Sequence, residues 1–134
     1  MTTIDTSKFD NCLKVKKAKA GRGLFTFSEI PKGTFLIEYC GKKLSESEKY
    51  ASNSKYLFEI NNKITLDGYI KDNNAKFINH SCRPNSEFVI KRDKVYIQSL
   101  RKIKPGEEIT VDYGPEYFKE YIKPIGCICS KCSK

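Results

Sequence analysis

The sequence predicts a single, mostly β domain with short strands and few short helices. Its 134 residues leave room for one compact domain with a modest core. Segments rich in β-branched and aromatic residues recur along the chain and end at turn residues, as strands do. Hydrophobic residues make up 39% and charged residues 31%, which excludes a disordered chain. Because no apolar run approaches the length of a membrane span, we expect no membrane partner.

Six segments carry the strand signal. A turn at residues 91–94 joins two of them in a predicted hairpin. In the last segment, the two-residue period of a strand places Ile109, Val111 and Tyr113 on one face. The predicted strands cover residues 34–40, 56–60, 63–66, 87–90, 95–100 and 108–113.

Helix signals are short. Ser45 and Glu48 have the spacing of a capping box, which predicts a brief helix that ends near Asn53. Pro115 favours the start of a second helical turn, which Pro124 ends.

The chain is basic, with 25 Lys and Arg against 16 Asp and Glu, a net charge of +9. This excess favours acidic surfaces or nucleic acid as partners. Basic residues gather in residues 8–22 and 91–104. A charge run is more often a solvated face, so a phosphate-binding surface and an ordinary solvated one both remain open.

The last ten residues, 125–134, hold three cysteines in the pattern C-x-C-x2-C. Three thiolates at this spacing suit tetrahedral Zn²⁺, which takes a fourth ligand from elsewhere. The alternative is a disulfide or unliganded thiols. The first ten residues show no secretory signal, which favours an intracellular protein and zinc. The candidates for the fourth ligand are Cys12, Cys40, His80 and Cys82.

Residues 77–85, FINHSCRPN, bring the only histidine together with a cysteine, two asparagines and a proline. A polar turn is the simpler interpretation, and a single histidine is more often structural than catalytic. Chemistry alone leaves both interpretations open.

With a second motif about 30 residues later, this segment resembles the SET-domain protein lysine methyltransferases. The second motif is GEEITVDYG at 106–114. Three shorter matches agree: GRGLF at 21–25, EYCG at 38–41, and YLF at 56–58 followed by LD at 66–67.

The resemblance extends from Lys14 to Cys132, and the compact chain is similar to small viral or bacterial members. It implies a SET domain over residues 1–124 and a zinc-binding post-SET tail over 125–134. The implied fold consists of small curved β-sheets with a pseudoknot, in which the C-terminal segment passes beneath a loop.

The family transfers a methyl group from S-adenosylmethionine to a lysine ε-amine. The in-line displacement requires cofactor and lysine to meet from opposite faces in a narrow channel. Tyr113 matches the catalytic tyrosine, whose hydroxyl orients the amine, and Tyr39 and Phe58 match positions in the channel. The amine has a pKa of about 10.4 in water, and an aromatic channel lowers it.

The resemblance also implies which residues hold S-adenosylmethionine: Arg22, Gly23, Tyr56, Lys76, Asn79, His80 and Phe118. Asn79 and the His80 backbone would hold the adenine and amino-acid ends, and Phe118 would cover the adenine. Lys76 stands where the family often has arginine, so a bidentate contact is lost. Asn85 and Asp112 match residues that brace the site.

For the zinc ion, the resemblance implies a closed site of four thiolates. Cys82 would join the three tail cysteines, Cys127, Cys129 and Cys132, and the bound tail would complete the lysine channel. Cys12 and Cys40 then remain free thiols. The tail ends in C-x2-C where many relatives have C-x4-C, and Arg83 stands where many carry an acidic residue.

Two positions that limit the degree of methylation in the family hold Phe88 and Val111, and their apolar side chains favour a di- or trimethyl product. A histone tail is the usual substrate, which implies a nuclear or chromatin location. The domain is itself basic, so its positive surface would contact nucleosomal DNA rather than the tail. A homodimer is expected by analogy with minimal viral members.

Three alternatives stay open. The chain could methylate a non-histone protein, or it could be a non-catalytic SET-like zinc module that binds chromatin. A basic zinc-ribbon-like nucleic-acid protein would leave the two long motifs unexplained.

Overall fold

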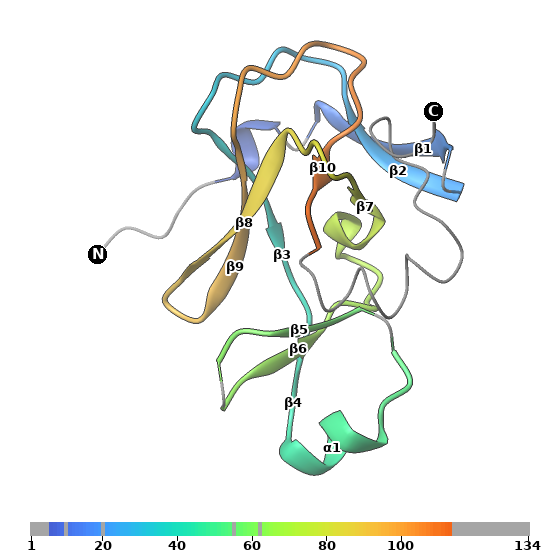
Figure 1. Ribbon diagram of the computed structural model, residues 1–134, viewed down its shortest axis with the longest axis vertical. Coiled ribbons are helices and arrows are strands. Elements are labelled where there is room, and N and C mark those ends of the chain that lie inside the picture. Colours follow the sequence, from blue (N-terminus) through green and yellow to red (C-terminus); the bar gives the residue numbers. More distant parts are fainter. Residues whose placement is uncertain (1–5, 10, 20, 55, 62, 114–134) are drawn as a thin grey trace.

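The computed structural model describes residues 6–9, 11–19, 21–54, 56–61 and 63–113, and it confirms the mostly β architecture (Figure 1). The strands form four small sheets of two or three strands each. The predicted helical turn after Pro115 and the tail lie outside the described residues. None of the helices in the described part has the length and apolar character needed to cross a membrane.

The central sheet contains β3 (Phe35–Tyr39), β9 (Lys94–Ser99) and β8 (Ser86–Lys91), in that order and all antiparallel. β8 and β9 form the predicted hairpin. Its two turn residues, Arg92 and Asp93, have positive φ angles of 52° and 62°. Positive φ at both central residues twists the turn in the same sense as the flanking strands, which suits a two-residue hairpin.

A second sheet orders β4 (Lys42–Leu44), β6 (Thr65–Asp67) and β5 (Leu57–Glu59). β5 and β6 confirm two predicted strands, although β6 begins and ends later than the sequence indicates. β4 is not predicted, because Lys-Lys-Leu is short and polar and its pairing with β6 comes from tertiary contact.

The only α-helix of the described residues, α1 (Glu46–Ala51), confirms the capping box. The Ser45 hydroxyl accepts a hydrogen bond from the Glu48 N–H at 3.2 Å, and the Glu48 carboxylate accepts one from the Ser45 N–H at 3.0 Å. The helix stops at Ala51, two residues before the expected end.

The N-terminal hairpin of β1 (Leu13–Ala18) and β2 (Gly21–Thr26) is also not predicted. A 3-10 helix, η1 (Ser7–Phe9), precedes it. The sequence of β1, LKVKKA, lacks a clear alternation of apolar and polar residues. Only Leu13 is buried, and the lysines of the strand face solvent.

The two long motifs meet in a parallel pair of strands, β7 (Asn79–His80) and β10 (Thr110–Val111). The 3-10 helix η2 (Asn74–Phe77) leads into β7. The predicted strand 108–113 is shorter than expected, because Glu108 bridges Phe25 of β2 instead of continuing the pair. The second motif therefore lies between β2 and β7.

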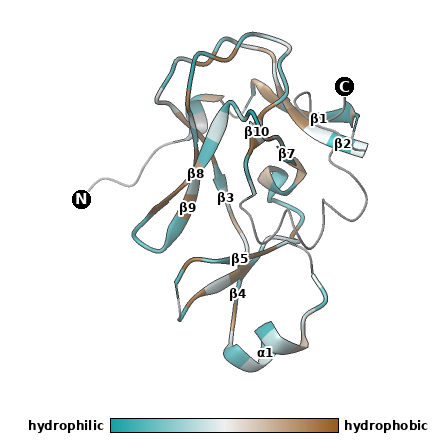
Figure 2. Cartoon of the chain, in the orientation of Figure 1, coloured by the Kyte–Doolittle hydropathy of each residue, from teal (hydrophilic) through white to brown (hydrophobic). Residues whose placement is uncertain are grey.

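One hydrophobic core is built from buried side chains of the central sheet, the N-terminal hairpin, β6, β10 and the segments between them. Figure 2 shows the hydropathy along the chain, with α1, which has no buried residue, largely hydrophilic. Ile109 and Val111 are fully buried and Tyr113 packs against the core, in agreement with the predicted shared face. The fully buried aliphatic side chains are Leu24, Ile30, Leu36, Ile78, Val95, Ile97, Ile103, Ile109 and Val111.

Candidate functional site

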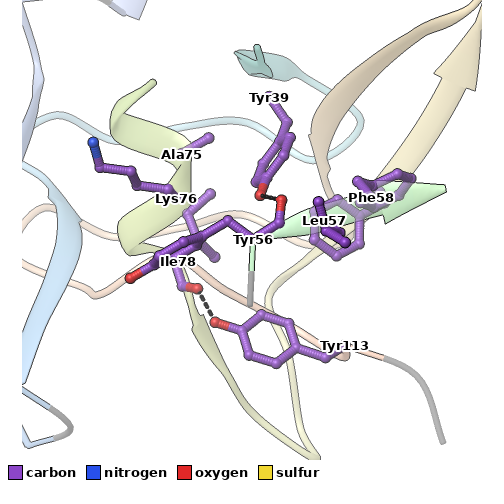
Figure 3. Close-up of a pocket in the computed structure, with 9 residues that line it drawn as sticks. Tyr39, Tyr56, Leu57, Phe58, Ala75, Lys76, Ile78 and Tyr113 are labelled. Carbon is purple, nitrogen blue, oxygen red and sulfur yellow. Dashed lines mark hydrogen bonds between the residues drawn. The ribbon is translucent and has the colours of Figure 1, made fainter. Parts of the chain in front are cut away.

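A pocket with a cavity volume of about 90 Å³ opens where β3, β5, η2 and the end of β10 come together (Figure 3). Nine residues line it: Tyr39, Tyr56, Leu57, Phe58, Ala75, Lys76, Ile78, Phe88 and Tyr113. The three residues that the resemblance assigned to catalysis and the channel, Tyr39, Phe58 and Tyr113, are thus brought to one pocket.

Three aromatic rings form one wall. The Phe58 and Phe88 centroids lie 4.9 Å apart, and the Tyr39 ring lies 5.7 Å from Phe58 and 6.2 Å from Phe88. The Tyr39 hydroxyl donates a hydrogen bond to the Tyr56 carbonyl at 2.8 Å. Gly68 makes room for this hydroxyl, because a Cβ atom there would collide with it.

Tyr113 forms the end of the pocket. Its hydroxyl donates a hydrogen bond to the carbonyl oxygen of Ile78 (Figure 3). With its proton directed to a carbonyl, the phenol oxygen acts as an acceptor toward any further donor. An apolar aromatic pocket that ends in such an oxygen suits an alkyl chain with an amine at its tip.

Asn79, Arg22 and Gly23 lie together beside the pocket rather than in its lining. The Asn79 Nδ2 atom donates to the Arg22 carbonyl at 2.8 Å and to the Glu108 carboxylate at 2.7 Å. A Cβ atom on Gly23 would collide with that carboxylate. The pocket and this group are connected, because Ile78 and Asn79 are adjacent in the chain.

Lys76 and Tyr56, both expected to bind the cofactor, line the pocket, but the Lys76 ammonium points away from it (Figure 3). The ammonium donates to the Ile70 carbonyl at 2.7 Å and lies 5.2 Å from the Tyr69 ring centroid. Tyr69 in turn stacks on Tyr56, with centroids 5.5 Å apart. Phe118, the remaining predicted cofactor contact, lies outside the described residues.

His80 lies between Tyr113 and Cys82. Its Nδ1 accepts a hydrogen bond from the Tyr113 N–H at 3.1 Å, and its Nε2 lies 3.4 Å from the Cys82 sulfur.

Asn85, which is expected to brace the site, connects two segments by hydrogen bonds. Its side chain donates to the Glu108 carbonyl at 2.7 Å and accepts from the Thr110 N–H at 2.9 Å.

Only one of the four expected zinc ligands, Cys82, falls in the described part of the chain. Within residues 6–113 as described, no group of three or more His, Cys, Asp or Glu side chains is placed to hold a metal. Cys12 accepts a hydrogen bond from the Ser28 hydroxyl at 3.2 Å, and burial raises the pKa of the Cys40 thiol. The other three predicted ligands, Cys127, Cys129 and Cys132, lie outside the described residues.

The structure differs from the sequence-based expectation at one of the two positions expected to limit methylation. Phe88 lines the pocket, whereas Val111 is fully buried in the core. Glu108 and Gly68 were not singled out as site residues. Glu108 could have been found from its place in the GEEITVDYG motif. Gly68 could have been found because it directly follows the LD match at residues 66–67.

The comparison with known proteins agrees with this geometry. The sequence model of the SET domain matches residues 21–114. The chain is 36% identical over 127 residues to histone-lysine N-methyltransferase 2D of Homo sapiens, covering 85% of this chain and 2% of that protein. It is 33% identical over 126 residues to histone-lysine N-methyltransferase trithorax of Drosophila virilis, covering 85% of this chain and 3% of that protein.

A plant relative covers more of both chains. Histone-lysine N-methyltransferase ASHH1 of Arabidopsis thaliana is 34% identical over 140 residues, covering 91% of this chain and 28% of the relative. The chain therefore spans less than a third of the length of these relatives. Because the SET-domain match covers well over half of its 134 residues and includes both long motifs, the chain belongs to the SET-domain family.

Proposed function

We propose that the chain is an S-adenosylmethionine-dependent protein-lysine N-methyltransferase. Its substrate is a lysine of a histone tail, and its product is the di- or trimethylated lysine. The observation that carries the proposal is the aromatic pocket that ends at the Tyr113 hydroxyl, beside the group of Arg22, Gly23 and Asn79. The relatives, all named histone-lysine N-methyltransferases, supply the substrate class.

The residues beside the pocket fit the cofactor. Gly21 has a φ of 91°, a conformation that favours glycine, and Gly23 lacks the Cβ that would fill the space next to the Glu108 carboxylate. The backbone of Arg22 and Gly23, the Asn79 amide and the His80 backbone would hold S-adenosylmethionine. When bound, this cofactor supplies the electrophilic methyl group.

The pocket prepares the lysine amine for attack. A protonated amine has no lone pair, so the neutral form must be present in the pocket. Tyr39, Phe58 and Phe88 exclude water, and removal from water lowers the pKa of the amine. The Tyr113 oxygen then accepts a hydrogen bond from the neutral amine and directs its lone pair along one line.

Phe88 supports the proposed product degree. A phenylalanine offers no hydroxyl to hydrogen-bond a partly methylated amine at this wall of the pocket. The amine is therefore able to rotate and accept a second or third methyl group.

We also propose a structural zinc ion held by Cys82 and the three cysteines of the tail. What supports it in the described chain is the donor set around Cys82. Because His80 Nδ1 accepts from the Tyr113 N–H, its Nε2 carries the hydrogen and donates it to the Cys82 sulfur at 3.4 Å. A hydrogen bond to sulfur favours the thiolate that zinc requires.

The basic surface points to a chromatin location. Lys14, Lys16 and Lys17 of β1 are all exposed, and exposed ammonium groups suit the phosphates of nucleosomal DNA. Such contact would hold the domain on a nucleosome, while the pocket receives the tail lysine.

The test is mass spectrometry of core histones and recombinant nucleosomes incubated with the protein and S-adenosylmethionine. The expected result is a series of added methyl groups on one lysine. The matched variant is Tyr113→Phe, which keeps the ring and removes the hydroxyl bonded to Ile78. We expect it to lower the rate on the order of 100-fold, because the amine loses its alignment.

The alternatives give different results. Binding of S-adenosylmethionine in calorimetry without histone methylation would indicate a non-histone substrate. Absence of both binding and methylation would contradict the proposal and indicate a non-catalytic zinc module that binds chromatin.

A further inference from the structure

We propose that Glu108 is a positioning residue of the cofactor site. It fixes the side-chain amide of Asn79 so that the amide oxygen, rather than the nitrogen, is presented to the ligand. This inference rests on the proposed function and deepens it, because it explains how the site selects the α-ammonium group of S-adenosylmethionine.

The orientation of the Asn79 amide follows from its two neighbours. One side-chain atom lies 2.7 Å from a Glu108 carboxylate oxygen and 2.8 Å from the Arg22 carbonyl oxygen. Both neighbours are acceptors only, so the atom between them must be the NH₂ group, which has two hydrogens to donate. The flipped amide would place three oxygen atoms together with no hydrogen between them.

The orientation of the Asn79 amide determines which kind of ligand group it can bind. Both amide hydrogens of Asn79 are engaged, so the Oδ1 atom is the part of the amide available to a ligand, and the ligand must donate. An α-ammonium group is a donor only and carries a positive charge. The negative charge of Glu108, one hydrogen bond away, favours a cation at this place. The adenine end offers acceptors as well as donors and gains less from the arrangement.

The surrounding chain holds Glu108 in this position. The Ile109 N–H donates to the Leu24 carbonyl at 2.7 Å, and the Asn85 side chain donates to the Glu108 carbonyl at 2.7 Å. Gly23 faces the carboxylate, and a Cβ atom there would collide with it. Gly23 therefore permits the close approach of the Glu108 carboxylate to β2.

The test measures binding rather than catalysis. Isothermal calorimetry compares S-adenosylhomocysteine, which keeps the α-ammonium, with 5′-methylthioadenosine, which lacks the amino-acid part. Glu108→Met removes the acceptor at similar size, and we expect it to weaken S-adenosylhomocysteine binding about tenfold. Its binding of 5′-methylthioadenosine should stay within about twofold of the wild type. Glu108→Gln retains an acceptor, so it should restore part of the lost affinity and serves if the methionine variant does not fold.

The matched control is Glu107→Gln. The Glu107 carboxylate is bonded to Arg101 at 2.8 Å and to the Lys104 N–H at 2.8 Å, away from Asn79. This variant should bind both ligands as the wild type does. Equal losses for the two ligands in Glu108→Met, or no loss for either, would overturn the inference and leave the proposed function intact. A wild-type chain that binds neither ligand would overturn both.

Discussion

The imidazole ring of His80 connects Tyr113 to Cys82. Its Nδ1 atom accepts a hydrogen bond from the Tyr113 N–H at 3.1 Å, and its Nε2 atom lies 3.4 Å from the Cys82 sulfur. The side chain is only 4% exposed, and its ring centroid lies 5.4 Å from that of Tyr113. The position of the tyrosine at the pocket end therefore depends on a ring that also touches a proposed zinc ligand.

Substitution of His80 should separate these two contacts. The Oδ1 atom of asparagine reaches the place of the imidazole Nδ1, so His80→Asn should retain the acceptor for the Tyr113 N–H and lose the contact with Cys82. His80→Leu loses both contacts. At saturating cofactor we expect the methyl-transfer rate to fall about tenfold in His80→Leu and clearly less in His80→Asn, because only the first misplaces Tyr113. Equal rates in the two variants would show that the hydrogen bond does not position the tyrosine.

Gly68→Ala should disturb the pocket wall. The added methyl group would collide with the hydroxyl and two ring carbons of Tyr39, whose hydroxyl is held by the Tyr56 carbonyl at 2.8 Å. Overpacking of a buried site costs about 1–3 kcal/mol, so urea denaturation should show a free energy of unfolding lower by that amount.

Removal of the ring provides the control for this collision. Tyr39→Leu in the Gly68→Ala background should recover part of the lost stability, although the same change in the wild type removes aromatic packing and a hydrogen bond and destabilises it. Additive losses in the double variant would mean that the methyl group and the Tyr39 ring do not compete for space.

The sequence predicts the central sheet and the first helix well, because their signals are local. β3, β8 and β9 are rich in β-branched and aromatic residues, and the Ser45 capping box needs only four consecutive residues. β1 and β4 were missed, because their lysines face solvent and only pairing with a partner strand defines them.

The candidate site is harder to predict, because it depends on contacts between distant segments. Periodicity places Tyr113 on the face of Val111, but the pocket also requires Tyr39 from β3 and Phe58 from β5. These residues were selected by resemblance to the family. Val111 was expected to limit the degree of methylation, yet in the strand that pairs with β7 it is fully buried in the core.

The capping box of α1 should make the stability of the helix depend on pH. The hydrogen bond from the Ser45 N–H, and after it the Lys42 ammonium at 3.1 Å, lower the pKa of Glu48 from 4.5 to about 2. A lowered carboxyl pKa contributes stability above the unfolded value, and this contribution is lost as the pH falls from about 4.5 to 2.

The variant Glu48→Gln keeps the geometry of the box and removes the titrating group. Its melting temperature should lie below that of the wild type at pH 7, and the difference should shrink as the pH falls below 4.5. Glu46→Gln, in the same first turn but outside the box, is the control. A difference that is constant between pH 7 and pH 2 would contradict the role of the Glu48 charge.

The proposed zinc site predicts that substitutions of two cysteines of the described chain have different effects on the zinc content. Cys82 contacts His80, whereas Cys12, which the family resemblance leaves outside the zinc site, accepts a hydrogen bond from the Ser28 hydroxyl at 3.2 Å. The purified wild type should contain one zinc ion per chain by mass spectrometry of the metal. Cys82→Ser should lose most of it, because a closed site needs all four thiolates, and Cys12→Ser should retain it. Equal zinc content in the two variants would exclude Cys82 as a ligand, and a wild type without zinc would contradict the site itself.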